Sequence, residues 1–313
     1  MFSFVIVSPS GEKSMVSLGA GRNAVVNGHL LVYSPGSVLI HMQAVVLARR
    51  GFILFLHRQF ENLDSADCII ERSTGSSTYR IKSGYKVVLF TAFAPTPVRM
   101  EPLPQKLSCF SSGYSRPVEV PESSQTYEDL LSGKVNVMSV SDKILKWNYL
   151  GLQGALMSTI MEPVYISNIC VIQHVNEQAV TRAVLLRFGE SRKSQLQITS
   201  LQEQISPHGE IYHDWVRGIG TVERLDPLTG RTITGSPSRL CKSEMFESWS
   251  RMMSHLKNVN SKTYSTCAEA KTNAKVYMNA LDSFIEQLDT LELGKWQRKD
   301  RRIDDFKLIS FDQ

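Results

Sequence analysis

The sequence has no C-x-x-C pair, and its five cysteines are an odd number spread along the chain. That pattern argues against a disulfide framework and favours reduced thiols, as in intracellular proteins. The longest apolar stretch, 38–56, is interrupted by charged and polar residues, so no stretch approaches the roughly 20 apolar residues of a membrane span. The N-terminus lacks the charged region and the cleavage site of a signal peptide. We therefore expect an intracellular protein with no membrane partner.

Neither sign of charge dominates the sequence, because 35 basic and 30 acidic residues give a net charge of only +5. This excess is compatible with a nucleic-acid partner but too small to indicate one. With 42% hydrophobic and 21% charged residues, the composition excludes intrinsic disorder. No internal repeat or linker divides the chain. The order of elements predicts one α/β domain over 1–313, with helices on both faces of a mixed sheet.

Local sequence patterns predict the strands, helices and loops of this domain. Residues 2–8 and 14–18 flank Pro9-Ser-Gly11 and predict a hairpin. Glycines 19 and 21 predict a plain turn, since they supply only part of a phosphate-binding fingerprint. Residues 101–125, rich in proline and serine, predict an exposed and mobile loop. The other expected strands are 30–33, 86–93, 164–175 and 195–200, with a hairpin around 226–230, and the expected helices are 38–63, 142–161, 177–188, 243–257, 265–290 and a short one near 295.

The segment 139–156 reads S-V-S-D-K-I-L-K-W-N-Y-L-G-L-Q-G-A-L, and E-P-V-Y-I-S follows at 162–167. It resembles, nearly letter for letter, the S-C-S-D-K-x-x-R-W-N-x-x-G-x-Q-G-x-L … E-P-V-Y-x-S block of the adenosine deaminases acting on RNA (ADARs) and the related tRNA editases. Further blocks agree in order: A-R-R-G-F at 48–52, S-R-L-C-K at 238–242, and the Lys, Tyr and Trp series at 271–296. The resemblance covers nearly the whole chain and implies the cytidine-deaminase-like fold of the ADAR deaminase domain, without a double-stranded-RNA-binding domain.

This resemblance also identifies what the chain has lost. In the family, one His and two Cys hold Zn²⁺, and a Glu two residues after the His moves protons. Counted from the double arginine at 49–50, Gln43 stands in place of the His and Val45 in place of the Glu. Thr96 and Val140 stand in place of the two Cys. Valine cannot bind a metal, and a carboxamide is a poor Zn²⁺ ligand. The resemblance therefore implies a pseudoenzyme with no zinc and no deaminase activity.

No neighbour is expected to replace the lost ligands. On a helix, His41 would face away from position 43, and Cys109 lies in the expected loop. Neither has a second ligand at metal spacing. The family's duplex-wedging Glu falls on Gly113, and the interval from Thr96 to Val140 is shorter than the family's RNA-contacting loop. We expect RNA to be bound only indirectly or weakly.

In the family, a set of cations and aromatic residues wraps a buried inositol hexakisphosphate. Cys267 and Leu281 depart from that set, since the family has Tyr and Lys there. Clustered interior cations repel one another and are costly to desolvate, so they require a polyanion or partner carboxylates. The alternative is that they are separate surface charges on several helices, but a structural polyanion site is favoured. The matching residues are Arg49, Arg50, Lys143, Lys146, Trp147, Gln153, Lys242, Lys271, Tyr277, Trp296 and Lys299.

A candidate interface follows from the same resemblance. Thr126, Tyr127, Glu128 and Asp129 occupy the place of the segment through which ADAR deaminase domains self-associate. Tyr127 keeps an aromatic anchor of the kind that interfaces favour, although it could equally pack on its own loop. The favoured function is a regulatory subunit that binds an active ADAR as a hetero-oligomer and modulates A-to-I RNA editing. The alternatives are a direct double-stranded RNA binder and an enzyme, which the degenerate positions argue against.

A nuclear location is expected from this function. The basic run at 298–302 resembles a nuclear-localisation patch, but Asp300, Asp304 and Asp305 interrupt it, which favours a solvated terminus.

Overall fold

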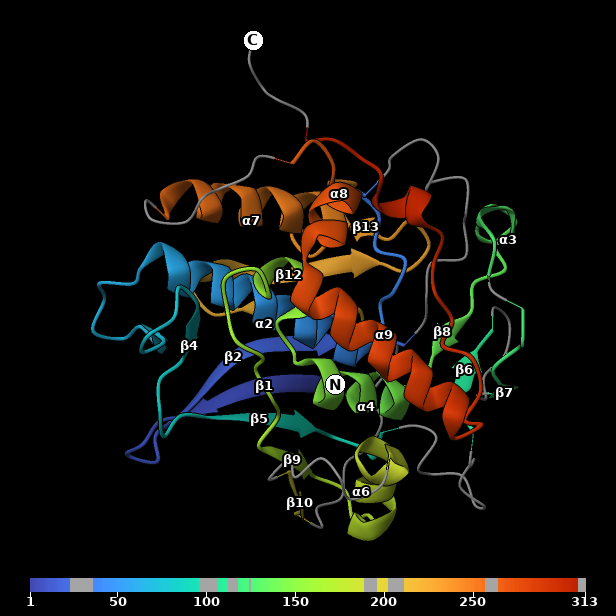
Figure 1. The fold of residues 1–313 in the computed structure, drawn as a ribbon, viewed down its shortest axis with the longest axis horizontal. Helices are drawn as coiled ribbons and strands as arrows, with labels where there is room; N and C mark the ends of the chain where they lie inside the picture. Colours follow the sequence, from blue (N-terminus) through green and yellow to red (C-terminus); the bar gives the residue numbers. More distant parts are fainter. Residues whose placement is uncertain are drawn as a thin grey trace.

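The computed structural model describes residues 1–22, 36–95, 106–111, 118–123, 125–188, 196–201, 211–256 and 264–308. Its centre is a mixed sheet of eight strands in the order β10-β9-β5-β1-β2-β11-β12-β13 (Figure 1). Strands β5, β9 and β10 run parallel to one another, and the other neighbours are antiparallel. The strands are β1 (Phe2–Val7), β2 (Lys13–Ala20), β5 (Lys86–Thr91), β9 (Asn168–Val171), β10 (Gln197–Ser200), β11 (His213–Val216), β12 (Ile219–Asp226) and β13 (Arg231–Thr232).

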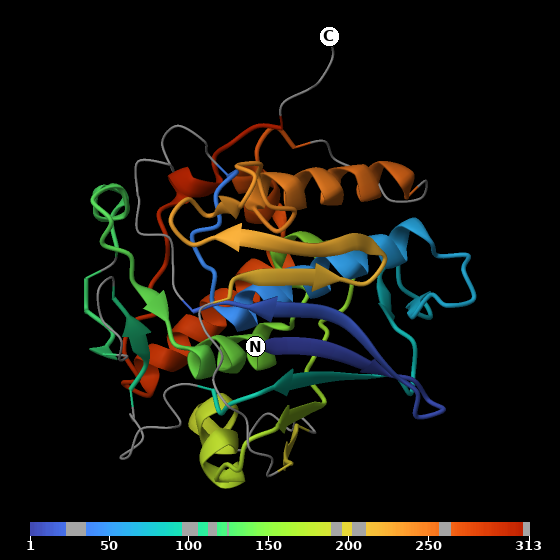
Figure 2. The same ribbon diagram turned by 180° about the vertical axis from the view of Figure 1, so that it is seen from behind.

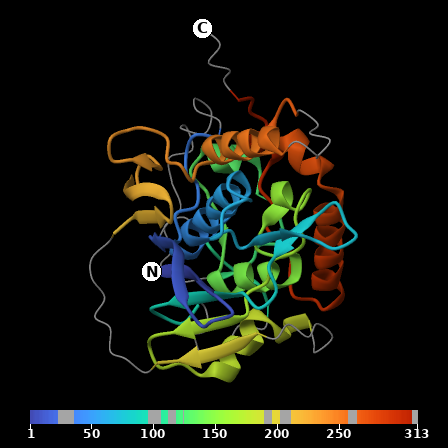
Figure 3. The ribbon, with the colours of Figure 1, turned by 90° about the vertical axis from the view of Figure 1, so that its left-hand side faces the viewer.

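Helices flank the sheet. In the side view of Figure 3, the strands of the central sheet lie on one side, and helices α2, α4, α7 and α9 lie on the other. The helices are α2 (Ala44–Glu61), α3 (Tyr127–Leu131), α4 (Val140–Leu150), α5 (Gly154–Met157), α6 (Glu177–Val184), α7 (Lys242–His255), α8 (Cys267–Asn273) and α9 (Lys275–Thr290), with 3₁₀ turns η1 (Leu186–Phe188) and η2 (Arg301–Asp304). Two smaller sheets pair β3 (Ile70–Arg72) with β4 (Tyr79–Ile81) and join β7 (Val118–Glu119), β6 (Ser108–Phe110) and β8 (Val137–Met138).

The core forms where α2 crosses β1, β2 and β11. This helix is apolar around most of its circumference, as expected for a helix buried between layers. The Phe52 ring lies 5.0 Å from the Phe4 ring of β1. The Ser17 hydroxyl donates to the Ala48 carbonyl over 2.8 Å, so that β2 is also tied to the helix by a buried hydrogen bond. The N-terminal end of α2 is thereby held at a fixed place beside the sheet.

This architecture confirms the predicted mixed α/β class, with a large mixed sheet and flanking helices. The described helices α2, α4, α7 and α9 lie on one side of the sheet, whereas the prediction placed helices on both faces. The hairpin predicted over 2–8 and 14–18 is β1–β2, and the predicted edge strand is β10. The predicted hairpin around 226–230 joins β12 and β13. The helix predicted over 38–63 is shorter than expected, since α2 begins at Ala44. The helix predicted over 142–161 ends at Gly151, because the φ of 88° at this glycine breaks the helix.

Three further expectations were wrong, and others lie outside the described residues. The glycine pair does not form a turn at Gly19, because β2 continues through Ala20 and pairs with both β1 and β11. Residues 107–110 are not an exposed loop, since they include the buried strand β6. No helix forms at residues 293–300. The strand expected at 30–33 and position Thr96 lie outside the described residues. No described helix combines the length and the apolar character that crossing a bilayer requires.

Gly19 offers a test of this packing. A Cβ at this position would lie 2.3 Å from the Ala44 carbonyl oxygen and 2.5 Å from the Ala48 amide nitrogen. Because backbone atoms cannot move aside cheaply, we expect Gly19→Ala to lower the free energy of unfolding by about 2 kcal/mol or more. Gly75→Ala is the control, since its Cβ would meet open space and only the positive φ of 74° would cost about 1 kcal/mol. Urea unfolding measures both, and equal losses would contradict the close approach.

Candidate functional site

Two of the positions that the resemblance identifies as degenerate lie where α2 begins. Gln43 is the N-cap of α2 and is 6% exposed, and Val45 follows in the first turn with no exposed surface. Val140 opens α4 and is also buried. The carboxamide Oε1 of Gln43 accepts a hydrogen bond of 2.8 Å from the Lys143 ammonium, which also donates to the Met138 carbonyl. The start of α2 and the start of α4 are therefore joined by an amide and an ammonium group.

Cys109 and His41, the two neighbouring residues considered as replacement zinc ligands, lie in other local structures than expected. Cys109 is not in a mobile loop but in β6, where it is fully buried and burial raises the pKa of its thiol. His41 is not on a helix, and its Nε2 is buried without a described hydrogen-bond partner. Within the described ranges, no group of three or more His, Cys, Asp or Glu side chains is arranged to hold a metal ion.

Behind these positions, cationic side chains from widely separated parts of the chain converge. Lys299 lies close enough to Lys242, Arg50 and Lys143 for each of them to lower its pKa, although burial lowers it most. Burial likewise lowers the pKa of His41, and the same four cations add to that effect. Arg49 and Lys146 form the next part of the group, because Arg49 helps to lower the pKa of Lys146. Figure 1 shows how α2, α4, α7 and α8, which carry most of these residues, gather in one region.

Burial dominates the electrostatics of this cation cluster, defined as Arg49, Arg50, Lys143, Lys146, Lys242, Lys271 and Lys299. It lowers the pKa of Lys143 and of Lys146 to about 7, and that of Lys242 to about 8. It also lowers the pKa of Arg49 to about 10. Such shifts mean that the charged forms of these groups lack compensation by solvent or by anions. The cluster is therefore a site of excess positive potential inside the protein.

One carboxylate partly neutralises this positive potential. Asp304 of η2 lies 2.5 Å from the Lys242 ammonium and 2.9 Å from that of Lys271. Burial alone would raise the pKa of Asp304, but the two lysines outweigh it and hold the pKa below its ordinary value. In return Asp304 outweighs the effect of burial on Lys271 and raises its pKa. Within the described residues, no other carboxylate forms an ion pair with a member of the cluster.

Several donors in the cluster have no described partner. The Nε of Arg49 is buried without a hydrogen bond, as is Nε2 of His41. Lys146 lies over the Trp296 ring at 4.6 Å, and Arg49 over the Trp147 ring at 5.0 Å, so aromatic faces supply part of the missing negative potential. Such an arrangement of unpaired interior cations fits a polyanion with several negatively charged oxygens.

The comparisons with known proteins bear on this site. The family model of the adenosine-deaminase (editase) domain matches residues 17–300. The chain belongs to the adenosine-deaminase (editase) domain family. It is similar to the double-stranded RNA-specific editase Adar of Drosophila melanogaster, with 28% identity over 95% of this chain and 49% of that protein.

Mammalian relatives give the same result. Identity to the double-stranded RNA-specific editase B2 of Rattus norvegicus is 27%, over 95% of this chain and 45% of that protein. Identity to the double-stranded RNA-specific adenosine deaminase of Mus musculus is 26%, over 96% of this chain and 29% of that protein. The editase-domain chain therefore spans about half or less of the length of these curated relatives.

Most of the predicted polyanion ligands are brought together in this editase domain, but Gln153 is used differently. Its Nε2 donates to the Leu150 carbonyl, and its Oε1 accepts from the Val164 amide. The side chain therefore closes the end of α4. The two departures from the family pattern also have local roles, because Cys267 is buried at the start of α8 and Leu281 packs into an apolar cluster around Phe284.

The predicted interface segment forms the short helix α3 at the outer edge of the molecule (Figure 1). Thr126 and Asp129 make a reciprocal capping box, which fixes the start of the helix. The half-buried ring of Tyr127 lies under the Arg302 guanidinium at 4.1 Å, and Glu128 is 3.4 Å from the same group. Tyr127 therefore packs within its own chain, while Glu128 keeps 71% of its side chain exposed.

Sequence reasoning missed two residues that lie beside the cation cluster. Asp304 was interpreted as an interruption of a solvated basic run, yet it is the carboxylate between two lysines. His41 was considered only as a zinc ligand. The sequence offers one indication of this role, because Asp304 follows the predicted ligand Lys299 by only five residues. The 3₁₀ turn η2, which brings the carboxylate back toward the cluster, is visible only in the structure. The basic run itself divides, because Arg298 and Arg302 are about half exposed while Lys299 is largely buried.

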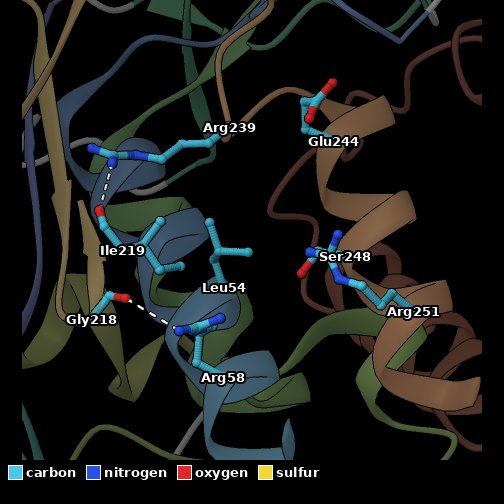
Figure 4. Close-up of a pocket in the computed structure, with 8 residues that line it drawn as sticks. All are labelled: Leu54, Arg58, Gly218, Ile219, Arg239, Glu244, Ser248 and Arg251. Carbon is cyan, nitrogen blue, oxygen red and sulfur yellow. Dashed lines mark hydrogen bonds between the residues drawn. The ribbon is translucent and has the colours of Figure 1, made fainter. Parts of the chain in front are cut away.

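A separate pocket of about 200 Å³ opens between α2, the β11–β12 turn and α7 (Figure 4). Its arginines already have partners. Arg239 donates to Asp214 over 2.7 Å and to the Ile219 carbonyl over 2.8 Å, and Arg58 reaches the Gly218 carbonyl. Burial raises the pKa of Asp214 to about 8 despite Arg239. We assign no function to this pocket.

The lowered lysine pKa values predict how stability depends on pH. Between about pH 7 and the ordinary lysine pKa, the unfolded chain binds protons that folded Lys143 and Lys146 have released. The free energy of unfolding should therefore rise with pH across this window in protein refolded without polyvalent anions. Urea unfolding at pH 7 and pH 9 measures the slope. Lys143→Met should flatten it, whereas Lys275→Met, on the exposed surface of α9, should not; equal slopes in both variants would contradict the burial of Lys143.

Proposed function

We propose that this chain is a catalytically inactive editase-domain protein that binds an active ADAR and regulates A-to-I RNA editing, through the localisation, stability or substrate choice of the editase. The observation that carries the proposal is the chemistry at the start of α2. Hydrolytic deamination needs an activated water and a group that moves protons. The proton-moving position is Val45, a hydrocarbon side chain with no exposed surface.

The zinc positions support the same conclusion. Val140 offers no donor atom, and the one oxygen available from Gln43 already accepts from Lys143. A neutral carboxamide beside a buried cation is an unfavourable place for Zn²⁺, because the ammonium would repel the metal. This local chemistry favours a role in binding over a role in catalysis.

An active editase is the proposed partner because the relatives carry the names of double-stranded RNA-specific editases. A domain of the same family can offer a surface that complements one of theirs, as symmetric association between like domains does. The exposed α3 segment supports this, since its capping box holds Thr126 to Asp129 in one conformation before binding. A preorganised segment loses less entropy when it docks.

The proposal gives RNA an indirect role. The net charge is +5, and the cations of the cluster are buried or partly buried, which limits their access to the phosphates of a duplex. The proposed location is the nucleus, with Arg298 and Arg302 as the exposed part of the basic run. Direct binding to double-stranded RNA is the competing function and gives a different experimental result below.

We also propose that the cation cluster holds inositol hexakisphosphate as a structural ligand. The unpaired Nε of Arg49 and the lack of a described anionic partner for Lys146 and Lys299 support a ligand with several phosphates. Asp304 would then form the edge of the site, where it orients Lys242 and Lys271. The ligand would lie behind the degenerate positions and would stabilise the fold.

Native mass spectrometry tests the ligand. The purified chain should carry an added mass equal to that of inositol hexakisphosphate, because the buried cations would otherwise remain uncompensated. Lys299→Met should reduce the bound fraction by tenfold or more, while Lys295→Met, an exposed lysine four residues earlier, should leave it unchanged. A folded protein that carries no anion would overturn this part of the proposal.

Co-purification tests the partner. Full-length active editase should be retained by the immobilised chain, and Tyr127→Ala should weaken binding by about tenfold, because the ring holds Arg302 beside Glu128 on the exposed side of α3. Tyr165→Ala removes another aromatic side chain, 43% exposed and elsewhere on the surface, and should have no effect. Thermal unfolding of both variants checks that they fold.

Two results would count against this function. A chain that remains monomeric in the presence of active editase would contradict the binding role. A duplex-RNA mobility shift by the chain alone, with a steep dependence on salt, would favour the direct RNA binder.

A further inference from the structure

The central sheet has a second face, opposite α2, whose side chains do not belong to the core. Strand registers align one row of outward residues across it: Trp215 pairs with Leu18, Leu18 with Ser3, Ser3 with Phe90, and Phe90 with Cys170. Directly opposed positions on neighbouring strands share a face, so these side chains form a continuous, mainly apolar row.

A second row runs beside the first. Val5 of β1 pairs with Met15 on one side and with Val88 on the other. None of the three packs against the buried core clusters, and Met15 is 39% exposed. Val222 of β12, another outward residue, is 53% exposed. Together with Trp215, Leu18, Phe90 and Cys170, these residues define what we call the outer sheet face.

No described helix covers this face. Figure 2 shows the strands of the central sheet in front, with α2 and α4 behind them, and the edge-on view of Figure 3 agrees. The described helix that contacts β1, β2 and β11 is α2, which lies on the inner side. A sheet with apolar residues on both faces is normally covered by a layer on each side. The outer sheet face therefore has the apolar composition of a face that is normally buried, yet no described helix packs against it.

The charge at one end indicates what would cover it. At this end Val7 pairs with both Lys13 and Lys86, so two exposed lysines flank an apolar residue. Neither lysine forms an ion pair within the described residues. The outward positions of β1, β2, β5 and β11 include no acidic residue. The face is an apolar band with one basic end.

We propose that the outer sheet face docks an amphipathic helix of the partner editase, with an apolar stripe toward the sheet and acidic residues near one helix end. This inference rests on the proposed function and gives that partner a second contact besides α3. Strand β1 has six residues, about 20 Å of strand, which a helix of about 13 residues matches in length. Apolar contact supplies the affinity, and the basic end at Lys13 and Lys86 fixes the direction of the helix.

The test uses the full chain and purified active editase. Lys13→Glu combined with Lys86→Glu reverses the charge at one end of the face without removing apolar surface, and should weaken binding by tenfold or more. Lys275→Glu combined with Lys295→Glu makes the same change in net charge on exposed positions elsewhere and should leave affinity unchanged. Calorimetric titration of each purified double variant with editase gives the affinities.

A footprint at Cys170 provides the second measurement. The other four cysteines are buried, whereas Cys170 is partly exposed on the outer sheet face, so a thiol reagent should modify it selectively. Its modification rate, followed by mass spectrometry of the peptide that contains it, should fall severalfold when editase binds.

The outcomes separate this inference from the function on which it rests. If editase binds but the charge reversal and the Cys170 rate show no change, the docking site is wrong while the proposed function stands. If editase does not bind at all, the proposed function fails and this contact fails with it. If Cys170 becomes protected in the chain alone as its concentration rises, a second copy of the chain occupies the face, and the editase helix is excluded.

Discussion

The constraint on which the rest of this structure depends is the burial of like charges. Cations from α2, α4, α7, α8 and the C-terminal segment meet in the interior, and Asp304 is the one described carboxylate that pairs with any of them. Interior charges of one sign must be neutralised, deprotonated or bound to an anion. The lowered pKa values of Lys143, Lys146 and Lys242 favour partial deprotonation near neutral pH when no anion is bound.

This constraint connects the charged interior with Gln43, at the start of α2, through Lys143. Its ammonium faces the cluster on one side and holds Gln43 and the Met138 carbonyl on the other. The start of α4 is fixed a second time by Asp142, which accepts from the Ser108 amide and the Ser139 hydroxyl and pairs with Arg187. Polar contacts thus join the start of α2 to the start of α4. Retention of the fold, together with the proposed loss of the metal ligands, is consistent with a chain that serves as a binding surface.

Much of the fold could be predicted from the sequence, because alternation in β1 and β2 and the apolar length of α2 are local signals. The polyanion positions could be predicted only through the family resemblance, since the cations are spread over residues 49–299 and no local pattern unites them. The use of Gln153 by backbone groups and the return of Asp304 through η2 depend on tertiary contacts. The buried strand β6 was missed because the proline and serine around it indicate a loop more strongly than Cys109 indicates a strand.

The most direct test of the central claim is a measurement of inosine. The purified full chain, supplied with Zn²⁺ and a long duplex RNA, should form no more inosine than a reaction without protein, because Val45 and Gln43 provide neither the proton transfer nor the metal ligand that deamination needs. An active editase of the family serves as the positive control under the same conditions. Zinc-dependent accumulation of inosine by this chain would contradict the account.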